Sequence, residues 1–144
     1  MRLPTLILSA LLLTAPAVAQ EQMGDPPFRP TVARPAYGAG GPMVQLDAGH
    51  GSVQTLDGRY AGFAALVRAD GYRIRAGEQK LDQPGALDGV DVLVISNAVR
   101  PRDGSSPDAF TPAEIAALDA WVRAGGSLLL AADHAPYGSA NETL

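Results

Sequence analysis

Residues 90–95 read Val-Asp-Val-Leu-Val-Ile, a run that is apolar except for Asp91. β-Branched residues dominate this run, which is typical of a strand buried on both faces of a parallel sheet. Asp91 lies near its start, where a charge still reaches water. Residues 127–132 form a similar apolar run, and we expect a second buried strand there. The two runs predict a sheet with helices on both sides.

The segments around these runs alternate between strand and helix patterns. Residues 43–47 predict a short strand, and residues 72–75 alternate apolar and charged side chains, as a half-exposed edge strand does. A helix is indicated before Gly71 by apolar residues at helical spacing, namely Tyr60, Phe63, Leu66 and Val67. A second helix opens at Thr111, where Pro112 and Glu114 complete a capping box.

This alternation predicts the fold class α/β, with a flavodoxin-like parallel sheet in the order 2-1-3-4 and flanking helices. Residues 139–142 form a second possible capping box, two residues before the last residue. A helix expected there would have no room to form. We therefore expect a domain that is truncated at its C-terminus.

The amino-terminal region has the three parts of a secretory signal peptide over residues 1–19. Arg2 provides the positive charge, residues 6–13 the apolar run, and residues 17–19 (Ala-Val-Ala) the cleavage site. A membrane-spanning helix would need roughly 20 apolar residues, more than are present before Pro16. Residues 20–42 are rich in proline and glycine and predict an extended or disordered linker. The predicted domain occupies residues 43–144.

Composition excludes several classes of function. The chain has no cysteine, which removes disulfides, thiolate ligands, cysteine nucleophiles and a lipidated N-terminal cysteine. Its net charge is −4 with mixed signs, and no basic stripe suggests nucleic acid or a membrane surface. We expect no nucleic-acid partner and no stable membrane span after signal cleavage. The predicted location is the periplasm or the medium.

Five motifs in sequence order resemble the class I glutamine amidotransferase-like superfamily, and more closely its exported or membrane-anchored branch labelled DUF4350. They cover residues 44–51, 66–72, 87–95, 110–115 and 125–130. The resemblance implies a flavodoxin-like fold and the N-terminal part of such a domain. Active members carry a nucleophilic cysteine in a turn that the resemblance places at residues 133–136. Because this chain has no cysteine, thiol-based glutamine hydrolysis is excluded.

Polar side chains follow the carboxyl ends of three predicted strands, where open parallel sheets bind ligands. They are Asp47, His50, Ser96, Asn97, Asp133 and His134. The aspartates and histidines, the only two histidines of the chain, are candidates for acid–base catalysis. His50, His134 and Asp133 are candidate metal ligands. The same residues can instead serve local structure, with the aspartates capping turns and His50 held between two glycines.

Other residues near this edge are candidates for ligand contact. Gly49 and Gly51 stand before the first helix, where backbone amides can hold an anion or merely form a turn. Arg100 and Arg102 flank Pro101, and they can bind a carboxylate or phosphate, or pair with Asp103. The predicted ligand-binding set is Gly49, Gly51, Ser96, Asn97 and Arg100.

These observations favour a noncatalytic ligand-binding or interaction module of the cell envelope, without a cofactor. Its partner would be a small molecule or an envelope protein. The alternative is a hydrolase that uses an Asp/His site at the strand ends, with or without a metal ion. A third possibility is that the truncated chain has no function by itself.

The signal sequence predicts that the secreted or periplasmic protein begins at Gln20, because cleavage follows the small residues of the site. Intact-mass measurement of the protein from an exporting host checks this. Ala19→Arg should block cleavage and retain residues 1–19, whereas the matched change Ala36→Arg should not. A mature protein that keeps Met1 would contradict the prediction.

Overall fold

The computed structural model describes residues 24–25, 27–38 and 40–132. Strands and helices alternate along this part of the chain, as the sequence predicts. The elements are β1 (Met43–Asp47), α1 (Ala61–Ala69), β2 (Arg73–Gly77), β3 (Val92–Ser96), α2 (Pro112–Arg123) and β4 (Ser127–Ala131). Residues 133–144, which include the predicted capping box at 139–142, lie outside the described residues.

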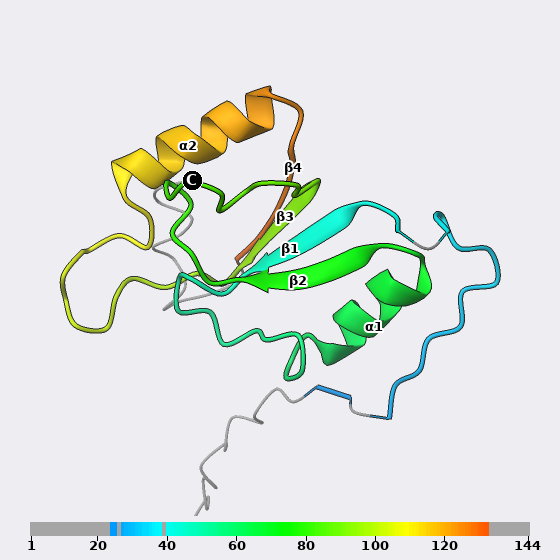
Figure 1. Ribbon diagram of the computed structural model, residues 1–144. Helices are drawn as coiled ribbons and strands as arrows, with labels where there is room; N and C mark the ends of the chain where they lie inside the picture. Colours follow the sequence, from blue (N-terminus) through cyan, green and yellow to red (C-terminus); the bar gives the residue numbers. More distant parts are fainter. Residues whose placement is uncertain (1–23, 26, 39, 133–144) are drawn as a thin grey trace, which may run out of the picture.

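The four strands form one parallel sheet in the order β2-β1-β3-β4. The predicted α/β class and strand order are therefore confirmed. β1 pairs with β2 on one side and β3 on the other, with Val44 beside Ile74 and Val92. All four carboxyl ends consequently meet at one edge of the sheet, next to the loops at residues 48–60 and 97–111 (Figure 1).

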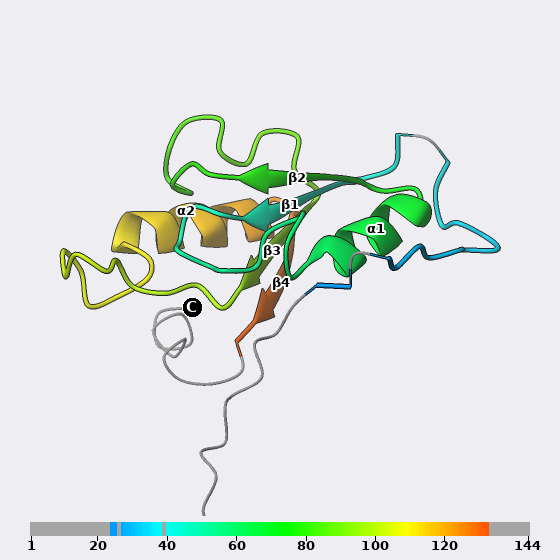
Figure 2. The same cartoon turned by 90° about the horizontal axis from the view of Figure 1, so that it is seen from below.

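The two helices cover opposite faces of the sheet (Figures 1 and 2). On the α1 face, Val44, Leu46 and Val94 are buried against partly buried residues that include Phe63 and Val67. On the α2 face, buried Leu93 and Ile95 pack with Leu118 and the loop residue Phe110. Alternate residues of β3 thus serve two cores, which is why its sequence is apolar throughout.

The capping box of α2 forms as predicted. The Thr111 hydroxyl accepts a hydrogen bond from the Glu114 amide at 3.2 Å, and a Glu114 carboxylate oxygen accepts one from the Thr111 amide at 2.9 Å. Two amides that would otherwise lack partners are satisfied in this way. The box fixes where α2 begins and which way the Glu114 side chain points.

The burial predicted for the fourth strand is wrong. β4 is the edge strand opposite β2, and Leu129 and Leu130 are 49% and 37% exposed. The apolar sequence indicates a buried strand, but the pairing partner and covering helix that would bury both faces are not found in the described part of the chain. Leu128, by contrast, packs against the core on the α2 side.

The end of the predicted linker is ordered against α1 and the turn that follows it. Phe28 lies beside Gly62, and the Ala36 and Tyr37 amides donate hydrogen bonds to Asp70 at 2.8 Å and 3.2 Å. Gly71 has a φ of +93°, and a Cβ there would collide with the Tyr37 carbonyl. We call residues 27–38 and 40–42 the strap. It runs past α1 before entering β1 (Figures 1 and 2).

Replacing Leu93 by Ala should lower the free energy of unfolding by about 2–5 kcal/mol, because the side chain is fully buried and leaves a cavity. Leu66→Ala is the matched control, since Leu66 is 46% exposed. Urea unfolding of both variants measures the difference. Equal losses would contradict the assignment of β3 as an inner, buried strand.

Candidate functional site

His50 is the centre of a buried ionic chain at the carboxyl end of β1. Its Nδ1 lies 2.9 Å from both carboxylate oxygens of Asp47, and its Nε2 lies 2.7 Å from Glu114 Oε1. All three side chains are almost completely buried, with 0–1% of their surface exposed. These contacts join the end of β1 to the first turn of α2, although Glu114 is 64 residues from His50 in sequence.

Asp47 and Glu114 each accept further hydrogen bonds. The Gly49 amide donates to Asp47 at 3.1 Å. Glu114 accepts from the Thr111 amide and hydroxyl at 2.9 Å each, and from the Leu81 amide at 3.3 Å. Lys80 Nζ lies 4.0 Å from Glu114. Buried charges of this kind persist only when they are paired and hydrogen-bonded, as these are.

The geometry fits a protonated imidazole. Each ring nitrogen faces a carboxyl group, and an imidazolium can donate a hydrogen bond to both. Burial lowers the pKa of His50, but the hydrogen bond and charge of Asp47 and the hydrogen bond of Glu114 outweigh it and raise the pKa above 6.5. The Phe110 ring, 4.2 Å from the imidazole between ring centroids, adds a favourable contact for the cation.

The pKa of Glu114 moves in the opposite direction. Burial raises it, but hydrogen bonds from Thr111 and His50 prevail and lower the pKa below 4.5. His50 and Glu114 are thus charged together at mildly acidic pH. Both His50 nitrogens are engaged and neither is exposed, so the imidazole does not face a substrate as a free base.

The end of β3 contributes a second polar group of contacts. The Ser96 hydroxyl lies 2.6 Å from the Tyr60 hydroxyl, which joins β3 to the start of α1. Asn97 follows with a φ of 49° and is the non-glycine residue with positive φ in the described part of the chain. Its side-chain oxygen is buried and has no hydrogen-bond partner among the described residues. Asn97 tolerates this backbone conformation better than most residues.

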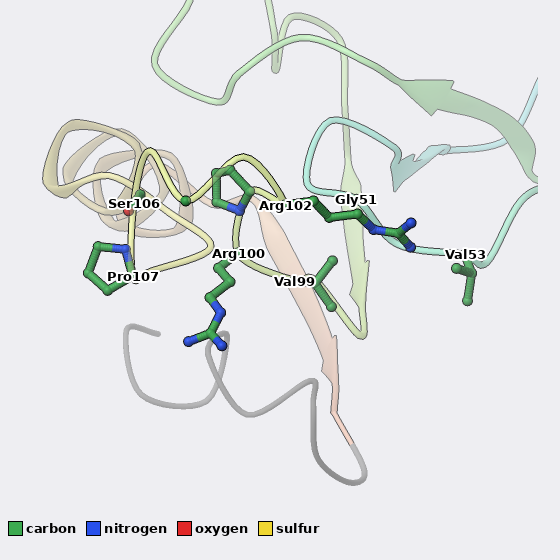
Figure 3. A pocket seen from close by; sticks show the side chains of 9 residues that line it. Gly51, Val53, Val99, Arg100, Arg102, Ser106 and Pro107 are labelled. Atoms are coloured by element: carbon green, nitrogen blue, oxygen red, sulfur yellow. The ribbon is translucent and has the colours of Figure 1, made fainter.

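An open pocket lies beside the ionic chain, between the loops that follow β1 and β3. Its volume is about 660 Å³, and a smaller pocket of about 300 Å³ adjoins it and reaches His50 and Lys80. Figure 3 shows the larger pocket, in which Arg102 extends toward Gly51 and Val53 while the side chain of Arg100 points away from these two residues. The lining residues are Gly51, Val53, Val99, Arg100, Pro101, Arg102, Gly104, Ser106 and Pro107.

Gly51 lines this pocket, and the geometry of its position favours a glycine. Its φ is +66°, and a Cβ at this position would lie 2.8 Å from Val99 Cγ2. A side chain here would be strained and would press into the opposite wall. The Val99 amide donates to the His50 carbonyl at 2.9 Å, which holds the two loops together.

The structure places most of the predicted site residues near one another. Asp47, Gly49, His50 and Gly51 form one turn after β1, and Arg100 lies across the pocket from Gly51. Ser96 ends β3 and Asn97 follows it, but neither residue lines either of the two pockets. Asp133 and His134, candidates for catalysis and metal binding, lie outside the described residues.

Sequence reasoning missed the role of Glu114. In the sequence, the place of Glu114 in the capping box already explains why a glutamate stands there. Its distance along the chain from His50 gives no sign that the two side chains meet. Asp103, the expected partner of the loop arginines, instead accepts a hydrogen bond from the Ser105 amide at 2.9 Å.

No set of three or more His, Cys, Asp or Glu side chains among residues 24–25, 27–38 and 40–132 is arranged to bind a metal ion. In Asp47, His50 and Glu114 the ligand atoms face one another in pairs, so they do not surround a common point. Across the same described ranges, no helix has the length and apolar character needed to cross a membrane.

His50→Gln should lower the free energy of unfolding by about 3 kcal/mol or more at pH 6, because it leaves two buried carboxylates without their cation. The parent protein should be less stable at alkaline pH. A raised folded-state pKa contributes stability that is complete below pH 6.5 and is lost as the pH rises through the pKa of folded His50. The contribution of Glu114 is complete above pH 4.5 and is lost as the pH falls through its lowered pKa.

Urea unfolding between pH 4 and pH 9 measures both effects. The alkaline decline should disappear in His50→Gln and persist in Glu78→Gln, which removes an exposed carboxylate instead. A parent protein whose stability rises through the same alkaline range would show that His50 is neutral in the folded state.

Comparison with protein families, with curated proteins and with solved structures finds no match to this chain. The resemblance to the glutamine amidotransferase-like superfamily therefore remains a prediction from its motifs. The observed fold is a parallel α/β sheet consistent with the flavodoxin-like class.

Proposed function

We propose that this chain is an exported, noncatalytic binding module of the cell envelope, which holds a small molecule in the pocket between the loops after β1 and β3. One observation carries the proposal. The imidazole of His50 is buried and bonded through both nitrogens to Asp47 and Glu114, whereas the adjacent pocket is open. The most reactive group of the described site thus has a structural role, and the accessible surface beside it is shaped for binding.

The position of the pocket supports the same function. It lies beyond the carboxyl ends of β1 and β3, the neighbouring strands whose connections leave the sheet on opposite faces. Ligands of open parallel sheets bind at this place. The signal-peptide pattern of residues 1–19 supports the envelope location.

The alternative, a hydrolase, needs a free base or a bound metal at the strand ends. Asp47 and His50 supply neither in the described structure, since each is engaged by the other and by Glu114 or Gly49. The geometry of the described residues favours binding over catalysis.

Titration of ¹⁵N-labelled protein with a mixture of small neutral and charged fragments tests the proposal. We expect amide shifts at Gly51, Val99 and Gly104, which line the pocket. Val53→Trp should abolish them by filling the pocket. Val122→Trp is the control, because Val122 is similarly exposed but lies on α2 (40% against 36%).

Two results would overturn the proposal. One is the absence of pocket shifts with every fragment. The other is hydrolysis of p-nitrophenyl acetate that Val53→Trp abolishes and Val122→Trp preserves, since the pocket would then be an active site.

A further inference from the structure

The pocket has a local charge opposite to that of the whole chain. The net charge of the chain is −4, yet the described residues that line the two adjoining pockets include Arg100, Arg102 and Lys80 and no aspartate or glutamate. A concave surface lined by one sign of charge concentrates ligands of the other sign. The charged side chains that line the two pockets therefore favour anionic ligands.

The buried carboxylates nearby do not cancel this charge. Asp47 and Glu114 are both bonded to the His50 imidazolium, and Lys80 lies 4.0 Å from Glu114. Two negative charges are thus matched by two positive charges before Arg102 is counted. The charges of Asp47, Glu114, His50 and Lys80 sum to zero. The guanidinium of Arg102 therefore adds a net positive charge beside them.

Arg102 is the residue best placed to bind an anion. Its side chain extends from the loop after β3 toward Gly51 and Val53 on the opposite side of the pocket (Figure 3). It makes no hydrogen bond or ion pair within the described part of the chain. The neighbouring carboxylate of Asp103 is engaged by the Ser105 amide. A guanidinium presents parallel N–H donors that match a carboxylate or phosphate.

The loop after β1 offers further donors on the other side. The amides of Gly51, Ser52 and Val53 donate no hydrogen bond to any described residue, and Gly51 has the positive φ that allows close approach of a ligand. Apolar surface between these polar groups comes from Val53, Val99, Pro101 and Pro107. A ligand that contacts both the hydrogen-bond donors and the apolar side chains of this pocket has an oxyanion and an apolar body.

We propose that the pocket binds a small organic oxyanion, a carboxylate or a phosphate ester, through Arg102 and the loop at residues 51–53, with its apolar body against Val99 and the loop prolines. This inference rests on the proposed binding function and adds the chemical class of the ligand. Carboxylate and phosphate share the geometry that a guanidinium recognises, and the experiment separates them.

Calorimetric titration at constant ionic strength with benzoate, phenyl phosphate and neutral benzyl alcohol tests the class of ligand. We expect one or both anions to bind and the alcohol not to bind. Arg102→Gln should weaken anion binding about 10- to 100-fold, the effect of losing a charge-assisted hydrogen bond. Arg102→Lys should lose less, since it keeps the charge but not the paired donors.

Arg68→Gln is the matched control. It makes the same change of charge at an exposed position on α1, away from both pockets, and should leave anion affinity unchanged. Arg102 is itself exposed, so its variants should keep the parent melting temperature.

The outcomes separate this inference from the function on which it rests. If benzyl alcohol binds as tightly as the anions and Arg102→Gln changes nothing, the anion class is wrong while the pocket remains a binding site. If Arg68→Gln weakens binding as much as Arg102→Gln, the effect is one of net charge and the assignment to Arg102 is wrong. If none of the three probes binds, the inference is overturned, and the fragment titration decides the binding function separately.

Discussion

A protonated imidazole between two buried carboxylates is the interaction on which this structure depends. It joins the end of β1 and the turn that follows it to the first turn of α2, although Glu114 is 64 residues from His50 in sequence. Glu114 also accepts from the Leu81 amide, so the long connection between β2 and β3 is tied to the same point. An arrangement with this many charged groups is stable only as a complete set, because removing one member leaves another charge buried and unpaired.

The same interaction separates the structural part of the strand-end region from its accessible part. In a protein that uses histidine as a base, at least one ring nitrogen must reach the substrate. Here both nitrogens are bonded to buried carboxyl groups, and the turn that carries His50 lines the neighbouring pocket. The lining of the larger pocket comes mainly from the loop at residues 99–107.

The sequence predicts the fold well because the relevant signals are local. The apolar run at residues 90–95, the helical spacing before Gly71 and the capping box at Thr111 each depend on neighbours within a few residues, and each has its expected element. The exposure of β4 was not predictable in this way, because burial depends on which strand or helix lies alongside. The contact between His50 and Glu114 was equally inaccessible, since only the assembled sheet brings the first turn of α2 to the end of β1. Asp47, Gly49, His50 and Gly51 lie together because they are close in sequence, but the partners of their side chains depend on tertiary structure.

The strap has a consequence for how the domain responds to mechanical tension. Its hydrogen bonds to Asp70 and Gly71 stand between the amino-terminal segment and β1, which is paired on both sides in the middle of the sheet. A pulling force on that segment acts first on these few bonds and on the contact of Phe28 with α1, and only afterwards on the ladders of β1. An extended chain spans about 3.3–3.6 Å per residue, so release of the strap can lengthen the protein by a few tens of ångströms while the sheet stays intact. Tension on the amino-terminal segment would therefore release the strap before it loaded β1.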